Sequence, residues 1–155
     1  MRHVFIRMIT NREHKILNQL RLLAIDVAPA ARAKLAAAVV IKGEVVSWGE
    51  NQIRSHPFQL RFGKNSESQY WHAETHAIYN ALKRVDVTDL NKASLYVVRV
   101  KRPHALSQTW NLAVSKPCRG CEFCASSFGI RRVVYSIDND FAEMDLNPVD
   151  KLKAA

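Results

Sequence analysis

Two short motifs constrain the fold of this chain: H-A-E at residues 72–74 and P-C-R-G-C at residues 117–121. One histidine and two cysteines are ligands that a tetrahedral zinc ion accepts, and a site with only three protein ligands keeps water in the fourth position. Zinc lowers the pKa of that water to about 7, which makes hydroxide available near neutral pH. The motifs therefore predict a Zn2+ site with the ligands His72, Cys118 and Cys121, and with Glu74 as the catalytic acid and base.

Both motifs are expected at the start of helices. His72 and Glu74 are two residues apart at the beginning of a helix predicted over 73–84, so their side chains point in different directions. Pro117 favours a helix start, and Cys118 and Cys121 would lie on one side of its first turn, where the helix dipole favours thiolates. This second helix is expected to end near residue 128, with a glycine at 129 as its C′ residue.

Two neighbouring residues could change the ligand set. His76 has the spacing of a second zincin histidine, but a zincin needs its glutamate directly after the first histidine, so we interpret His76 as a helix residue near the site. Cys124 would permit a closed structural site, yet it lies about 9 Å along the helix from Cys118 at ~1.5 Å per residue. We expect Cys124 to be a buried free thiol. A closed site with four protein ligands would also give Glu74 no catalytic role, and this favours a catalytic zinc site.

The remaining segments alternate between helix and strand patterns. Thr10 and Glu13 have capping-box spacing, and a helix is expected over 11–25. The segments 51–70 and 101–116 lack a useful period and are expected to be irregular. Strands are predicted at 35–42, 44–49, 95–100, 132–137 and 141–146. These elements predict an α/β protein, a three-layer α/β/α domain over 1–155 with a mixed sheet of about five strands, of which the last two could form an antiparallel hairpin.

The composition limits the partner and the compartment. The chain has a net charge of +9 and 48% hydrophobic residues, so one core is expected, and the partner is expected to be anionic: a phosphate-bearing small molecule or a polynucleotide. Three cysteines, an odd number at metal spacing, favour a reducing compartment over a disulfide framework. No apolar stretch approaches the ~20 residues of a membrane span. We expect a cytoplasmic protein that does not contact a membrane.

The two zinc motifs resemble those of the cytidine deaminase-like superfamily, in the division with H-A-E that includes deoxycytidylate deaminases and tRNA adenosine deaminases. The resemblance runs from about residue 35 to residue 135. It implies a hydrolase that converts a cytosine base to uracil and releases ammonia, with Glu74 moving the protons. It also implies that Asn51 contacts the sugar, that the backbone N–H of Ala73 binds the pyrimidine carbonyl, and that the chain forms a homo-oligomer.

The substrate depends on the two segments that match the superfamily least, 51–71 and 101–116. We predict His56, Ser115 and Pro117 as further substrate-binding residues. Arg54, Arg61 and Lys64 could bind one phosphate, although a solvated loop surface explains these three about equally well. The first hypothesis is therefore a free nucleotide or nucleoside, as for a deoxycytidylate deaminase.

The alternative substrate is a cytosine or adenine base in single-stranded DNA or RNA. Basic residues are spread over the chain, and aromatic residues could stack on splayed bases: Phe58, Tyr70, Trp71 and Trp110. Aromatic residues near a pocket are more often core or pocket wall, and the basic residues do not form one stripe. A third hypothesis is a non-catalytic protein whose zinc only stabilises the fold.

Overall fold

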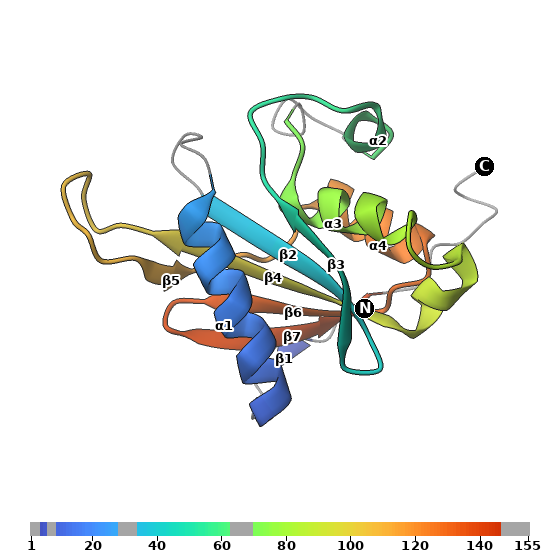
Figure 1. The fold of residues 1–155 in the computed structure, drawn as a ribbon, viewed down its shortest axis with the longest axis horizontal. Coiled ribbons are helices and arrows are strands. Elements are labelled where there is room, and N and C mark those ends of the chain that lie inside the picture. The colour runs from blue at the N-terminus through green and yellow to red at the C-terminus, as the bar shows by residue number, and fades with distance from the viewer. Residues whose placement is uncertain (1–3, 6–8, 28–33, 63–69, 147–155) are drawn as a thin grey trace.

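The computed structural model describes residues 4–5, 9–27, 34–62 and 70–146. One mixed sheet lies between α1 (Asn11–Asp26) on one face and α3 (Ala73–Ala81) with α4 (Arg119–Ser127) on the other (Figure 1). Each face has its own buried cluster: Leu17 and Leu20 of α1 pack on one side, and Ile78 of α3 with Cys124 of α4 on the other. The predicted three-layer α/β/α architecture is confirmed.

Seven strands form the sheet within the described residues: β1 (Val4–Phe5), β2 (Lys34–Ile41), β3 (Glu44–Glu50), β4 (Ala93–Lys101), β5 (Asn111–Ala113), β6 (Arg132–Ile137) and β7 (Asp140–Asp145). Six follow the order β1-β7-β6-β4-β2-β3, and β5 pairs with β4; only the β4–β6 pair is parallel. The predicted antiparallel hairpin at the end is β6 and β7, joined by a tight turn.

Two segments differ from the sequence-based expectation of irregular structure. The first contains the short helix α2 (Pro57–Leu60), and the second contains β5. Two further elements were not expected from the sequence. Strand β1 adds to the five expected strands of the sheet, and a 3-10 helix, η2 (Val87–Lys92), precedes β4. These additions are two to six residues long, too short to produce a periodic pattern in the sequence.

Helix α1 begins as its capping box predicts. The Thr10 hydroxyl accepts a hydrogen bond from the Glu13 backbone N–H at 3.2 Å, and the Glu13 carboxylate accepts one from the Thr10 N–H at 3.3 Å. The other carboxylate oxygen of Glu13 accepts from the Tyr96 hydroxyl at 2.8 Å and from Arg132 at 3.0 Å. Arg132 also pairs with Glu143 on β7. This network joins α1 to three strands across the buried face of the sheet.

The contact between α3 and β3 depends on Gly49. A Cβ at Gly49 would lie 2.3 Å from the backbone nitrogen of Ala77 and 2.5 Å from the carbonyl oxygen of Ala73, so only glycine allows this approach. Ser47 donates a hydrogen bond to the Ala77 carbonyl at 2.7 Å, and Asn80 donates one to the Trp48 carbonyl at 2.8 Å. The helix that begins after His72 is therefore seated closely on the sheet.

Within the described ranges, no helix combines the length and the apolar character needed to cross a bilayer.

Candidate metal centre

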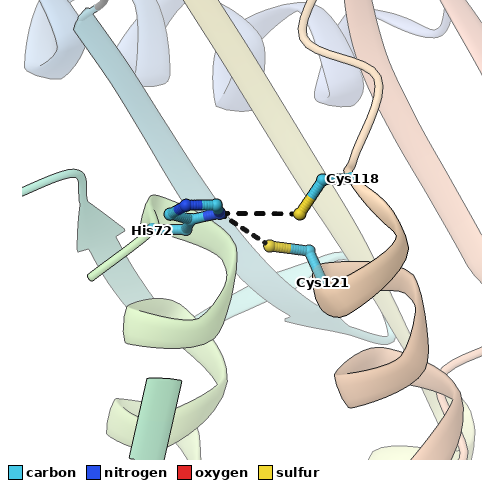
Figure 2. Close-up of side chains that lie close together, drawn as sticks. All are labelled: His72, Cys118 and Cys121. Atoms are coloured by element: carbon cyan, nitrogen blue, oxygen red, sulfur yellow. Dashed lines mark hydrogen bonds between the residues drawn. The ribbon is translucent and has the colours of Figure 1, made fainter. Parts of the chain in front are cut away.

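The starts of α3 and α4 face each other across the site (Figure 2). His72 is the N-cap residue of α3, and Glu74 lies in the first turn of that helix. Cys118 is the N-cap residue of α4, with Cys121 in its first turn, and Gly129 follows the helix with a φ of +87°. The sequence-based expectations for both helix starts and for the C′ glycine are confirmed.

The three predicted ligands lie together. The Nδ1 atom of His72 is 3.3 Å from the sulfur of Cys121 and 3.6 Å from the sulfur of Cys118. The three ligand atoms all lie within 4.8 Å of one another. A tetrahedral zinc ion with Zn–N of ~2.0 Å and Zn–S of ~2.3 Å needs N···S separations of about 3.5 Å. The donor set therefore fits Zn2+ in both type and spacing.

The two cysteines are coupled. A hydrogen bond from Cys121, with a further one from His72, lowers the pKa of Cys118 to about 4 although burial opposes this. The hydrogen bond to Cys118 and full burial raise the pKa of Cys121. One thiolate is therefore already favoured, and a metal ion would replace the proton of the second thiol, because ligating cysteines bind as thiolates.

Glu74 is a buried carboxyl group beside these ligands. The residue is 4% exposed, and this burial raises the pKa of its carboxyl group, while the charge of His72 partly opposes the rise. Within the described part of the chain, Oε2 of Glu74 has no hydrogen-bond partner. A buried carboxyl group of this kind is costly unless a ligand satisfies it, and a raised pKa suits a group that accepts and donates protons near neutral pH.

Neither neighbouring residue joins the ligand group. Cys124 is a fully buried free thiol in the core between α3, α4 and the sheet, as expected, and burial raises its pKa. His76 accepts a hydrogen bond from the Glu50 backbone N–H at 3.1 Å, and its ring lies 4.3 Å from that of Trp71. Burial lowers the pKa of His76. His76 thus holds α3 against the end of β3.

A pocket of about 470 Å³ opens above the ligand group, a volume within the ~300–1,000 Å³ typical of small-molecule sites. Three predicted substrate-binding residues line it: Asn51, Ala73 and Ser115. His56 and Pro117 are not among its lining residues. The pocket is lined by Leu35, Asn51, Gln52, Ile53, Tyr70, Trp71, His72, Ala73, Glu74, Arg99, Val114, Ser115, Lys116 and Cys118.

His56 has structural contacts instead. Its Nδ1 accepts a hydrogen bond from the Phe58 N–H at 3.1 Å and so caps α2, and its ring stacks on Trp71 at 3.9 Å between centroids. Trp71 in turn lines the pocket. His56 therefore supports the wall of the pocket from behind.

Asn51 and Ser115 also have partners in the fold. The side-chain oxygen of Asn51 accepts from the Leu35 N–H at 2.9 Å, which fixes Asn51 where β3 ends. Ser115 is buried, with 3% of the residue exposed, and its hydroxyl donates to the Val97 carbonyl at 2.9 Å. Both residues hold pocket segments in place, whatever contact they make with a ligand.

Gln59, which supports the metal centre from α2, was not among the residues expected from the sequence. Its side-chain oxygen accepts hydrogen bonds from the His72 backbone N–H, at 3.1 Å, and from the Thr75 hydroxyl. Its side chain is fully buried. The His72 side chain makes no capping hydrogen bond at the start of α3. Gln59 on α2 instead accepts a hydrogen bond from the backbone N–H at this helix start. The only sequence signal was His56-Pro57, an N-cap and first-turn proline pair that fits a short helix.

Comparison with known families agrees with this geometry. The fold and the His-Cys-Cys group beside a buried glutamate are those of a zinc-binding deaminase domain. Residues 10–137 match the family described as the cytidine and deoxycytidylate deaminase zinc-binding region, and the chain belongs to that family. A search of curated protein sequences finds no significant match.

Two solved structures share the fold. A dCMP deaminase from the cyanophage S-TIM5 in its apo form is 19% identical over 83% of this chain and 84% of its own, with a TM-score of 0.56. The same deaminase in complex with dCMP and dUMP is 18% identical, covers 83% of both chains and has a TM-score of 0.55. At this identity the likeness establishes the common fold.

Proposed function

We propose that this protein is a zinc-dependent hydrolytic deaminase that converts a cytosine base to uracil with release of ammonia. One group of side chains carries the proposal: the ligand atoms of His72, Cys118 and Cys121 lie within 4.8 Å of one another. Glu74 lines the same pocket, and its Oε2 has no hydrogen-bond partner among the described residues. Membership of the deaminase family supports it. When bound, Zn2+ supplies a water of lowered pKa.

Glu74 performs the proton transfers in this proposal. Its carboxylate accepts a proton from the attacking water and donates it to the ring nitrogen of the base, and it then carries a second proton to the leaving amine, so that water and cytosine become uracil and ammonia. Burial raises the pKa of Glu74, which favours the protonated form that the second half of each transfer needs. The N–H of Ala73 is assigned to the pyrimidine carbonyl and Asn51 to the sugar.

We place a free nucleotide or nucleoside first as the substrate. The pocket volume suits one such molecule, and a deaminase of the same fold has been solved with dCMP and dUMP. Three of the aromatic residues expected to stack on the bases of a polynucleotide have other surroundings. Phe58 and Trp71 are buried, and the ring of Trp110 is covered by the cations of Lys34 and Arg102. Tyr70 is exposed and lines the pocket.

We further propose that residues 1–155 act as one deaminase domain in the cytoplasm, where the ligating thiols stay reduced. The resemblance to related deaminases also leads us to propose a homo-oligomer. Light scattering of the zinc-loaded protein measures its mass directly, and a mass of one chain would reject the oligomer.

The activity is tested by ammonia release from a panel of cytosine, adenine and guanine compounds, each as base, nucleoside, nucleotide and single strand. We expect turnover of cytosine nucleotides or nucleosides. Glu74→Gln should retain zinc and lose about 10²–10⁴-fold in rate. Glu44→Gln, an exposed carboxylate in the β2–β3 hairpin, is the matched control and should turn over normally. Normal turnover by Glu74→Gln would reject the mechanism.

A further inference from the structure

The pocket contains two cations that the deamination chemistry does not require. Arg99 on β4 and Lys116, two residues before Cys118, both line it. Among the described residues that line the pocket, Glu74 is the one with a carboxyl side chain. Arg99 and Lys116 therefore give the pocket two positive charges that an anionic group of a ligand can meet.

The strand register directs Arg99 toward the zinc side of the sheet. Leu95 and Val97 precede it at alternate positions of β4, and both belong to the core cluster that contains α3 and α4. Alternation places Arg99 on the same face. Arg99 also pairs in register with Leu35 of β2, which lines the same pocket.

The guanidinium of Arg99 has unused hydrogen-bonding capacity. Its Nη1 donates to the Val114 carbonyl at 3.5 Å, a long contact, and within the described residues its buried Nε has no partner. A buried N–H without a partner is unfavourable unless a ligand oxygen accepts from it. The planar fork of an arginine side chain matches the oxygens of a phosphate.

A hydroxyl network fixes the backbone around both cations. The Ser136 hydroxyl accepts from the Arg99 N–H at 3.0 Å and donates to the Ala113 carbonyl at 2.6 Å. The Ser115 N–H donates to the Ser136 carbonyl at 2.9 Å. The segment that carries Lys116 is thereby held between β4 and β6, beside the start of α4.

The basic residues expected from the sequence to bind a phosphate lie elsewhere. Arg54 donates to the Gln52 side chain at 2.6 Å, and the Arg61 guanidinium lies over the rings of Phe58 and Phe62. Neither lines the pocket. Lys64 is outside the described residues.

We propose that Arg99 and Lys116 form a phosphate subsite in this pocket, so that the substrate is a nucleoside monophosphate and not a nucleoside. Arg99 donates from Nε to a phosphate oxygen, and Lys116 supplies a second positive charge at the mouth of the pocket. This inference rests on the proposed deaminase function, and it adds the group that distinguishes a nucleotide from the corresponding nucleoside.

The test compares dCMP with deoxycytidine as substrates of the zinc-loaded protein. We expect kcat/KM to favour dCMP, and Arg99→Gln to reduce this preference by about 10–100-fold, because a hydrogen bond to a charged group is lost. Lys116→Gln should reduce the preference as well. Lys116 is exposed, so its replacement keeps the test valid even if Arg99→Gln fails to fold. Arg54→Gln, a nearby basic residue outside the pocket, should keep the wild-type preference.

Calorimetric binding of dCMP, deoxycytidine and inorganic phosphate separates the subsite from the chemistry. If no compound is deaminated but dCMP still binds more tightly than deoxycytidine in an Arg99-dependent way, the deaminase proposal fails and the subsite stands. If cytosine compounds are deaminated but dCMP and deoxycytidine are used equally, or Arg99→Gln and Lys116→Gln leave the preference unchanged, the subsite is rejected.

Discussion

Replacing Gly49 by alanine should move the zinc-motif helix away from the sheet. A Cβ at this position lies 2.3 Å from the nitrogen of Ala77 and 2.5 Å from the carbonyl oxygen of Ala73. Non-bonded contacts need roughly 3.5 Å, so α3 has to shift by about 1 Å. Both obstructing atoms belong to the backbone, and no side-chain rotation relieves the overlap.

The structure gives an order of magnitude for both consequences. Overpacking of a buried contact costs ~1–3 kcal/mol. A loss of about 2 kcal/mol lowers the Tm of a protein of this size by about 4–8 °C. Ala73 belongs to the first turn of the helix that carries Glu74 and follows His72. A displacement of ~1 Å at a catalytic group can reduce the rate about 100-fold.

The assays are thermal unfolding by circular dichroism, zinc affinity by competition with a chromophoric chelator, and ammonia release. Gly129→Ala is the matched control, because Gly129 has a φ of +87° and its Cβ would lie 3.2 Å from the Cβ of Asn91. This control should lose stability without losing zinc affinity, since Gly129 follows the end of α4 remote from the ligands. Wild-type Tm and zinc affinity in Gly49→Ala would refute the packing argument.

Three further variants test other contacts. Gln59→Leu keeps the side-chain volume but removes the acceptor for the His72 N–H, so chelator competition should show weaker zinc binding; unchanged affinity would reject this positioning role. Arg132→Met leaves the buried carboxylates of Glu13 and Glu143 without their cation. The free energy of unfolding, measured by urea denaturation, should fall by ~3–5 kcal/mol, and a loss below about 1 kcal/mol would contradict this role of Arg132. Burial lowers the pKa of His76 in the folded protein below its unfolded value of about 6.5. The contribution of His76 to stability is therefore complete above the unfolded pKa and is lost as the pH falls through the folded pKa. The stability of the wild type relative to His76→Asn should therefore decrease from pH 7.5 to pH 5, and a constant or rising difference would contradict this sign.

The elements with local sequence signals were predicted well. The capping box of Thr10 and Glu13 marked the start of α1, and alternating apolar runs marked the long strands. The three residues predicted as zinc ligands lie together in the structure, as expected from the spacing that a metal and two helix starts require. These signals all lie within a few residues of the feature that they predict.

The missed features depend on contacts between distant segments. Strand β5 has three residues and exists because it pairs with Arg99 to Lys101 of β4. Helix α2 has four residues and is held by its His56 cap and by aromatic contacts of Phe58. The hydrogen bond from the His72 N–H to Gln59 joins α3 to α2, and no periodicity in the sequence encodes such a pair.

The central claim is that three protein ligands hold the metal and leave one position for water. Zinc K-edge X-ray absorption of the zinc-loaded protein tests this directly. We predict two sulfur ligands at ~2.3 Å and two nitrogen or oxygen ligands at ~2.0 Å, with an unchanged spectrum for Cys124→Ser. A third sulfur ligand that disappears in Cys124→Ser would show a closed structural site and contradict the claim.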